Sequence, residues 1–180
     1  MNIKLYILER LRGEPNLKKL KKMGLKIGSH FQYGRYCFFD PAHCFLISIG
    51  NDVTFSTRVH ILAHDASTKK HLNYVKIGQV IIEDHVFIGA NSTILPGVTI
   101  GENSIIGAGS VVSKNVEKNS VYAGVPAKKI CSVEDYLKKV NLIDRNLWFE
   151  EDYTIKGGIT KEKKESMKKM LEGGKIGLVK

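Results

Sequence analysis

A branched aliphatic residue recurs every six positions in the middle of this chain. A period of six fits neither an amphipathic helix, in which apolar residues recur every three or four positions, nor a half-buried strand, which alternates by two. It is typical of a solenoid, in which each repeat forms one short face of a three-sided coil and points its aliphatic side chain inward. The series runs without a gap through Ile82, Ile88, Ile94, Ile100, Ile106 and Val112.

A second set of small or apolar residues follows the first at a constant offset of four positions. We expect these side chains to fill the other inward position of each repeat, and they are Val86, Ser92, Val98, Ser104, Ser110 and Val116. Gly89, Gly101 and Gly107 follow the aliphatic residue directly, where we expect the chain to bend tightly. An antiparallel sandwich is the alternative fold, but its strands would alternate by two and its turns would not recur every six residues.

The same spacing extends toward the N-terminus with larger residues and breaks twice. Between 40 and 43 the sequence is irregular, and between Leu62 and Val80 it is polar and has no sixfold pattern. The second break predicts a loop extruded from the solenoid, and long loops in compact domains often carry function. The positions that keep the register are Ile27, Tyr33, Phe39, Ile49, Phe55 and Ile61.

These patterns divide the chain into three parts. We expect a basic, helical N-terminal segment at 1–26, a solenoid at 27–131 with an extruded loop at 62–80, and a helical C-terminal extension at 132–180. Residues 1–11 are rich in apolar side chains, but Glu9 and Arg10 interrupt them and no small-residue cleavage site follows. We therefore expect neither a signal peptide nor a membrane span.

Charge and cysteine content narrow the function classes. Most of the net charge of +10 comes from 1–26, where eight Lys or Arg face Glu9 and Glu14. Such a cluster is typical of a solvated helix face, so we expect no nucleic-acid partner. The three cysteines lack CxxC spacing, which supports neither a disulfide framework nor a zinc knuckle and favours the cytoplasm.

His64 is the main candidate for chemistry. A packed solenoid has no interior room for a ligand, so binding must use its outer surface, its loops or a groove between adjacent solenoids. His64 stands where the sixfold register fails, at the point where the loop leaves the solenoid. A neutral imidazole there can take a proton from a hydroxyl or an amine, and Asp65 or a backbone carbonyl would hold its tautomer.

Four segments of the chain resemble the hexapeptide-repeat acyltransferases. The resemblance covers roughly 26–130. Within the family, the chain is similar to the galactoside and maltose O-acetyltransferase branch, which includes sugar O-acetyltransferases of surface polysaccharide synthesis. This resemblance implies a left-handed parallel β-helix, a homotrimer with active sites between subunits, and acetyl transfer from acetyl-CoA to a hydroxyl of a sugar or saccharide, with no metal. The segments are IEDHVFIGA at 82–90, ILPGVTIG at 94–101, IGAGSVV at 106–112 and AGVPA at 123–127.

The resemblance also implies roles for single residues. The catalytic base of the family is a loop histidine upstream of the Phe-Ile-Gly repeat, which corresponds to His64. The aromatic run at 36–39 replaces the acceptor-binding Asn of galactoside-type enzymes, so this chain departs from the family there. The candidates for acceptor binding are Asp40 and Asp65; a carboxylate can bind a sugar hydroxyl, although an Asp that precedes a proline, as Asp40 does, is at least as often a turn-former. A backbone amide near Ala90 would stabilise the oxyanion. The acetyl-CoA groove would be formed by Ala90, Ala108, Ser113, Lys114 and Lys128.

Several other functions remain open from the sequence. The acceptor can be an amine of a nucleotide-linked amino sugar or the hydroxyl of serine. A zinc enzyme similar to the γ-class carbonic anhydrases would use His60, His64 and His85 as ligands. A non-catalytic scaffold would instead present the outer faces of the solenoid to a partner.

Overall fold

The chain forms two compact units, Met1–Glu134 and Asp135–Lys180. The computed structural model describes residues 15–180. The apolar stretch at 1–11 and much of the basic segment at 1–26 therefore lie outside the described residues. Within the rest of that segment, α2 (Leu17–Lys22) is helical, and the side chain of Asn16 caps it by accepting the Lys19 N–H at 2.9 Å. Across 15–180, no helix combines the length and the hydrophobicity that crossing a membrane requires.

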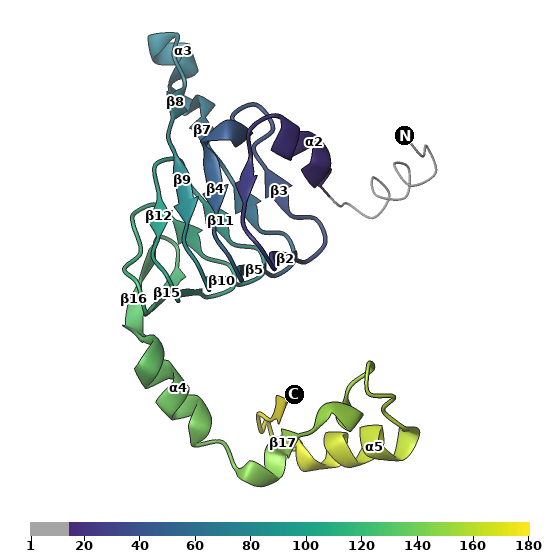
Figure 1. Cartoon of the computed structure of the whole chain (residues 1–180). Helices are drawn as coiled ribbons and strands as arrows, with labels where there is room; N and C mark the ends of the chain where they lie inside the picture. The colour runs from purple at the N-terminus through teal and green to yellow at the C-terminus, as the bar shows by residue number, and fades with distance from the viewer. Residues whose placement is uncertain (1–14) are drawn as a thin grey trace. The chain divides into compact units, whose positions relative to one another are not determined.

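The first unit is a three-sided solenoid of short parallel strands (Figure 1). The first sheet contains β1 (Lys26–Ile27), β4 (Ile47–Ile49), β9 (Val80–Ile82) and β12 (Thr99–Ile100). The second contains β2 (Gln32–Tyr33), β5 (Thr54–Phe55), β10 (Phe87–Ile88), β13 (Ile105–Ile106), β15 (Ser120–Gly124) and β16 (Ala127–Ser132). The third contains β3 (Phe38–Phe39), β6 (His60–Ile61), β11 (Thr93–Ile94) and β14 (Val111–Val112).

The order of the strands defines the topology of the solenoid. From β1 to β14, and apart from the inserted loop, consecutive strands enter different sheets and every third strand returns to the same sheet. Within these three sheets, only β15 and β16, the last two strands of the second sheet, pair antiparallel. This topology confirms an all-β fold of largely parallel sheets and rules out the antiparallel sandwich.

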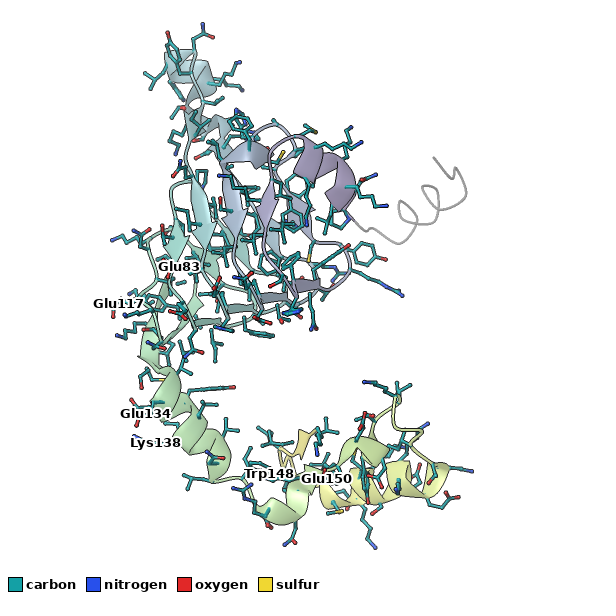
Figure 2. All side chains as sticks on the ribbon, in the orientation of Figure 1. Glu83, Glu117, Glu134, Lys138, Trp148 and Glu150 are labelled. Carbon is teal, nitrogen blue, oxygen red and sulfur yellow. The ribbon has the colours of Figure 1, made fainter. Side chains whose placement is uncertain are left out.

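The predicted inward residues form the core of the solenoid. Every member of the two sixfold series between 82 and 116 is at most 4% exposed. The inward serines are satisfied, because Ser92 and Ser110 donate to the carbonyl of Gly107 at 3.1 and 2.6 Å, and Ser104 donates to the carbonyl of Glu117 at 2.8 Å. Charged side chains such as those of Glu83 and Glu117 lie on the outside (Figure 2). Both inward positions inferred from the sequence are therefore confirmed.

The glycines after the aliphatic residues have a different cause from the one expected. Positive φ angles recur every six residues, but at His85, Asn91, Gly97, Asn103 and Gly109. Gly89 is needed because the next coil is too close: a Cβ there would lie 2.5 Å from the backbone nitrogen of Ala108. The turns themselves use residue types that tolerate the left-handed region.

The extruded loop is an ordered arm, defined here as residues 62–79, because Val80 already begins β9. Its base is an antiparallel pair of β7 (His64–Asp65) and β8 (Lys76–Ile77), and its tip carries a 3₁₀ turn at Ala66–Thr68 and α3 (Lys69–Leu72). The arm projects from the solenoid (Figure 1). Its two ends are joined by a hydrogen bond from the Gly78 N–H to the Ala63 carbonyl at 3.0 Å.

The second unit is built around two helices. They are α4 (Val133–Asn141), which begins just before the unit, and α5 (Lys161–Met170), whose N-cap Thr160 accepts the Lys163 N–H at 3.3 Å. Between them lies β17 (Trp148–Phe149), which pairs in parallel with β18 (Leu178–Val179), the strand that follows α5. The guanidinium of Arg145 lies 3.8 Å from the ring centroid of Trp148, which Figure 2 labels.

Replacing Gly89 by alanine tests the spacing between coils. The added methyl group would meet backbone atoms, which cannot rotate away, so we expect the free energy of unfolding to fall by about 2 kcal/mol or more. Gly109→Asn is the matched control, because Gly109 has an open surrounding and Asn91 already occupies the equivalent turn of the preceding coil. Urea denaturation of both variants measures the difference, and equal stabilities would contradict the argument.

Candidate active site

His64 and Asp40 form a hydrogen-bonded pair at the base of the arm. The Nδ1 atom of His64 contacts Oδ2 of Asp40. Asp40 is fully buried, whereas the side chain of His64 remains 36% exposed. A buried carboxylate thus holds one edge of the imidazole, and the other edge is accessible from the surface.

The register of the third sheet brings these two residues together. Phe39 of β3 pairs with Ile61 of β6. Asp40, the residue after β3, therefore lies beside Leu62, the residue after β6. The Asp40 N–H donates to the Ile61 carbonyl at 2.9 Å, which carries the Asp40 side chain to the start of the arm. There Oδ2 also accepts the Ala63 N–H at 3.2 Å, next to the His64 ring.

The carboxylate of Asp40 fixes the protonation pattern of His64. Burial alone would raise the pKa of Asp40, but hydrogen bonds from His64 and from the backbone of Ala42 and His43 outweigh it, so the pKa lies below its usual range. An ionised carboxylate can only accept hydrogen bonds. In neutral His64, Nδ1 must therefore carry the proton. Nε2 then has a free lone pair and can accept a proton.

Asp65 does not hold His64, in contrast to the expectation from the sequence. Its carboxylate pairs with Lys76 at 2.6 Å across β7 and β8 and accepts the Ser67 N–H at 2.8 Å. The side chains of neighbouring strand residues point in opposite directions, so Asp65 and His64 cannot face the same partner. The hydrogen bonds from Lys76 and Ser67 lower the pKa of Asp65 to about 2. Asp65 therefore braces the arm.

His43 is a third member of this cluster that the sequence did not single out. Its ring centroid lies 5.1 Å from that of His64, and its Nδ1 atom lies 3.8 Å from Oδ2 of Asp40. That nitrogen is buried and has no hydrogen-bond partner among residues 15–180. The irregular stretch at 40–43 was the signal in the sequence that could have identified His43. Asp40 starts a turn that brings His43 back toward the Asp40 carboxylate, whose Oδ1 accepts the His43 N–H at 3.3 Å.

The five residues expected to bind the acyl donor lie at two corners of the solenoid. Ala90 and Ala108 stack at the corner after the second sheet, where the Gly109 N–H donates to the Ala90 carbonyl at 2.7 Å. Lys128 of β16 pairs with Ala123, whose Cβ approaches the same stack at Gly107.

Ser113 and Lys114 follow β14 at the next corner. That corner is the one where Asp40 and Leu62 follow β3 and β6. Within one chain, His64 is therefore near the corner that carries Ser113 and Lys114. The remaining three residues lie at the corner after the second sheet, and they are Ala90, Ala108 and Lys128.

The three histidines considered as zinc ligands are not gathered within the chain. His60 lies on the outer face of β6, where it contacts the ring of Phe38, and His85 occupies a turn beside Asp52. In residues 15–180, the only group of three or more potential ligands close enough for one metal ion is Asp40, His43 and His64.

Known proteins show the same repeat and a related fold. Residues 79–114 match the sequence model of the hexapeptide repeat of succinyl-transferase. The chain is 36% identical to protein CapG of Staphylococcus aureus over 81% of this chain and 94% of CapG. It is 34% identical to galactoside O-acetyltransferase of Lactococcus lactis over 72% of this chain and 76% of that protein. The crystal structure of a maltose O-acetyltransferase from Clostridium difficile superposes with a TM-score of 0.54 at 34% identity, covering 59% of this chain and 57% of that one.

The pairing of Asp65 with Lys76 gives a prediction for titration by NMR. With a pKa of about 2, the carboxyl carbon of Asp65 should shift little between pH 7 and pH 4. In a Lys76→Ala variant the largest cause of the lowered pKa is removed, so the midpoint should rise toward the ordinary value of about 4. A wild-type midpoint near 4 would show that the pair does not form.

Proposed function

This chain belongs to the hexapeptide-repeat acetyltransferases, and we propose that it transfers the acetyl group of acetyl-CoA to a hydroxyl group of a sugar or saccharide. The observation that carries the proposal is the buried Asp40 holding the accessible His64 at the base of the arm. A general base needs a lone pair directed at the acceptor and a fixed orientation, and this pair provides both. The proposed setting is the cytoplasm, where acetyl-CoA is made, and the proposed pathway class is polysaccharide synthesis.

The reaction would be a direct transfer. The acceptor oxygen attacks the carbonyl carbon of the thioester while Nε2 of His64 takes the hydroxyl proton. The carbon–sulfur bond then breaks, and coenzyme A leaves as a thiol after receiving a proton. Asp40 stabilises the imidazolium that forms in between, because its carboxylate is already ionised and hydrogen-bonded to Nδ1.

Asp40 is not available to bind the acceptor. Its two oxygens accept the N–H groups of Ala42, His43 and Ala63 besides the bond from His64, and the residue is fully buried. Asp65 is occupied by Lys76 and Ser67. Recognition of the sugar therefore falls to other groups, and the exposed Tyr74 of the arm is one candidate.

The donor site supports a proposal of subunit sharing. Ala90, Ala108 and Lys128 occupy a different corner from His64, so one chain does not place them around one thioester. In a homotrimer with left-handed solenoids, as the family resemblance predicts, the corner of one subunit that carries Ala108 would face the arm of the next. Ala90 and Ala108 would leave room for the pantetheine chain, and Lys114 and Lys128 would meet phosphates.

The first experiment is acetyl transfer with a panel of sugars, nucleotide-linked amino sugars and serine, followed by release of free thiol. We expect thiol release that requires a sugar acceptor. His64→Ala should lower kcat by about 10² to 10⁴-fold, the usual contribution of a general base. Asp40→Asn should lower kcat at least about tenfold, because it no longer holds the productive tautomer.

Two matched variants make the result specific. His60→Ala removes an exposed histidine from the same sheet, and Asp65→Asn removes the other carboxylate near His64; both should keep most of the activity. An unchanged rate in His64→Ala would disprove its role as base. Turnover with a nucleotide-linked amino sugar but with none of the sugar hydroxyls would show that the acceptor is an amine, and the proposed hydroxyl acceptor would be wrong.

Mixing two inactive variants tests the shared site. Ala108→Trp should block the donor groove and His64→Ala should remove the base, so each homotrimer should be inactive. In trimers assembled from equal amounts of both chains, about a quarter of the interfaces combine an intact groove with an intact base. Recovery of activity near that fraction supports a site between subunits, whereas no recovery in trimers shown to be mixed means that each chain carries a complete site.

A further inference from the structure

The cluster of Asp40, His43 and His64 has the composition of a metal site. One ligand atom from each residue lies within 4.8 Å of the others. Two imidazole nitrogens and one carboxylate oxygen are a common ligand set for Zn²⁺ and for other divalent first-row transition metals. The carboxylate gives the cluster the negative charge that a divalent cation needs.

The buried Nδ1 atom of His43 is the observation that points to a ligand. A buried ring nitrogen without a hydrogen-bond partner is costly, and native proteins rarely leave one unexplained. Oδ2 of Asp40 is 3.8 Å away, which is beyond hydrogen-bonding distance. The nitrogen lies near the carboxylate that His64 also contacts, and the ligand atoms of the three residues lie within 4.8 Å of one another.

We propose that Asp40, His43 and His64 bind one divalent transition metal ion such as Zn²⁺. Bonds of about 2.1 Å in a tetrahedral arrangement separate ligand atoms by roughly 3.4 Å. The separation between His64 and Asp40 lies below that value, the 3.8 Å between His43 and Asp40 lies above it, and no two of the three ligand atoms are more than 4.8 Å apart. Small side-chain rotations therefore bring the three atoms to it. The exposed edges of His43 and His64 leave a route of entry and a fourth position for water.

Metal binding here has a chemical consequence for His64. The ion takes the place of the single proton that neutral His64 carries on Nδ1, and the ring takes up a proton from solvent at Nε2 in exchange, so the imidazole stays neutral. Nε2, the nitrogen proposed to accept the acceptor's proton, is then already protonated. A bound ion therefore blocks acetyl transfer; this consequence rests on the proposed function, whereas binding itself does not.

Binding is measured on the EDTA-treated full chain with Zn²⁺ competing against a chromophoric chelator, and with Co²⁺ as a spectroscopic probe. We expect one Zn²⁺ per chain and the visible absorption of four-coordinate Co²⁺. His43→Gln should weaken Zn²⁺ binding by at least about 100-fold, more than the loss of an outer partner of a ligand costs. Wild type that binds no Zn²⁺ above the level of His43→Gln overturns the proposal.

His30→Gln is the matched control. His30 also hydrogen-bonds an aspartate, since its Nδ1 lies 3.0 Å from Asp52, but it is exposed and lies at another corner. If Zn²⁺ binding is lost in His30→Gln and kept in His43→Gln, the ion binds at the wrong cluster and the proposal fails.

A wild-type measurement guards against a misfolded variant. Zn²⁺ should protect His43 and His64, but not His30, from modification by diethyl pyrocarbonate, as read by mass spectrometry of peptides. Equal modification of the three with and without Zn²⁺ contradicts the proposal.

The inhibitory consequence is tested separately from binding. The readout is the ratio of acetyl-transfer rates without and with Zn²⁺, taken within each variant so that a changed basal rate does not matter. We expect a ratio well above one in wild type, restored to one by EDTA, and a ratio near one in His43→Gln. Binding with no inhibition would overturn the inhibitory step and leave the metal site; absence of any acetyl transfer would concern the proposed function alone.

Discussion

The close approach of backbones in consecutive coils governs the rest of this molecule. Aliphatic side chains stack inside the solenoid, and the strands around them pair in register with their equivalents one coil away. At Gly89 this leaves no space for even a methyl group. The same fixed spacing places Asp40 beside the start of the arm, so the geometry of the candidate active site is a product of the coil register rather than of local loop structure.

The sequence predicted the solenoid well because its core is periodic. Each inward residue depends only on its own repeat and its nearest neighbours, so a period of six is sufficient to find it. His64 was also identifiable, since it marks the place where the period fails. The periodicity could not show the pairing of Phe39 with Ile61, because the irregular stretch at 40–43 lies between them and its contribution to the register cannot be counted from the pattern.

The periodicity does not reveal which residues of neighbouring coils meet, and this explains why the sequence did not identify the hydrogen-bond partner of His64. Asp65 is next to His64 in the chain and was the natural partner to expect, but adjacent residues of a strand face opposite ways. The hydrogen-bond partner of His64, Asp40, comes from the neighbouring coil, whereas the sequence favours acceptor binding or a turn for it. Gly89 and Gly101 are a similar case, since each is required by a backbone in the next coil and not by the turn in which it stands. Non-local contacts explain each of these cases.

A buried carboxylate that accepts four hydrogen bonds is a rigid support for a catalytic group. Each oxygen accepts two of these bonds, and removing one donor would weaken the pairing of a buried, ionised group, which is more costly than losing an ordinary surface contact. The orientation of His64 is therefore set by the backbone of three residues, Ala42, His43 and Ala63, and is insulated from changes at the surface.

The hydrogen bond between Gly78 and Ala63 closes the arm where it leaves the solenoid. The chain thus returns to the next coil at almost the point from which it departed, and the stacked strands on either side pair as if nothing had been inserted, with Ile49 next to Ile82. Substitutions, insertions and deletions in the tip are consequently decoupled from the register of the core. Evolution can therefore change the tip while inheriting the base of the arm and the coils around it unchanged.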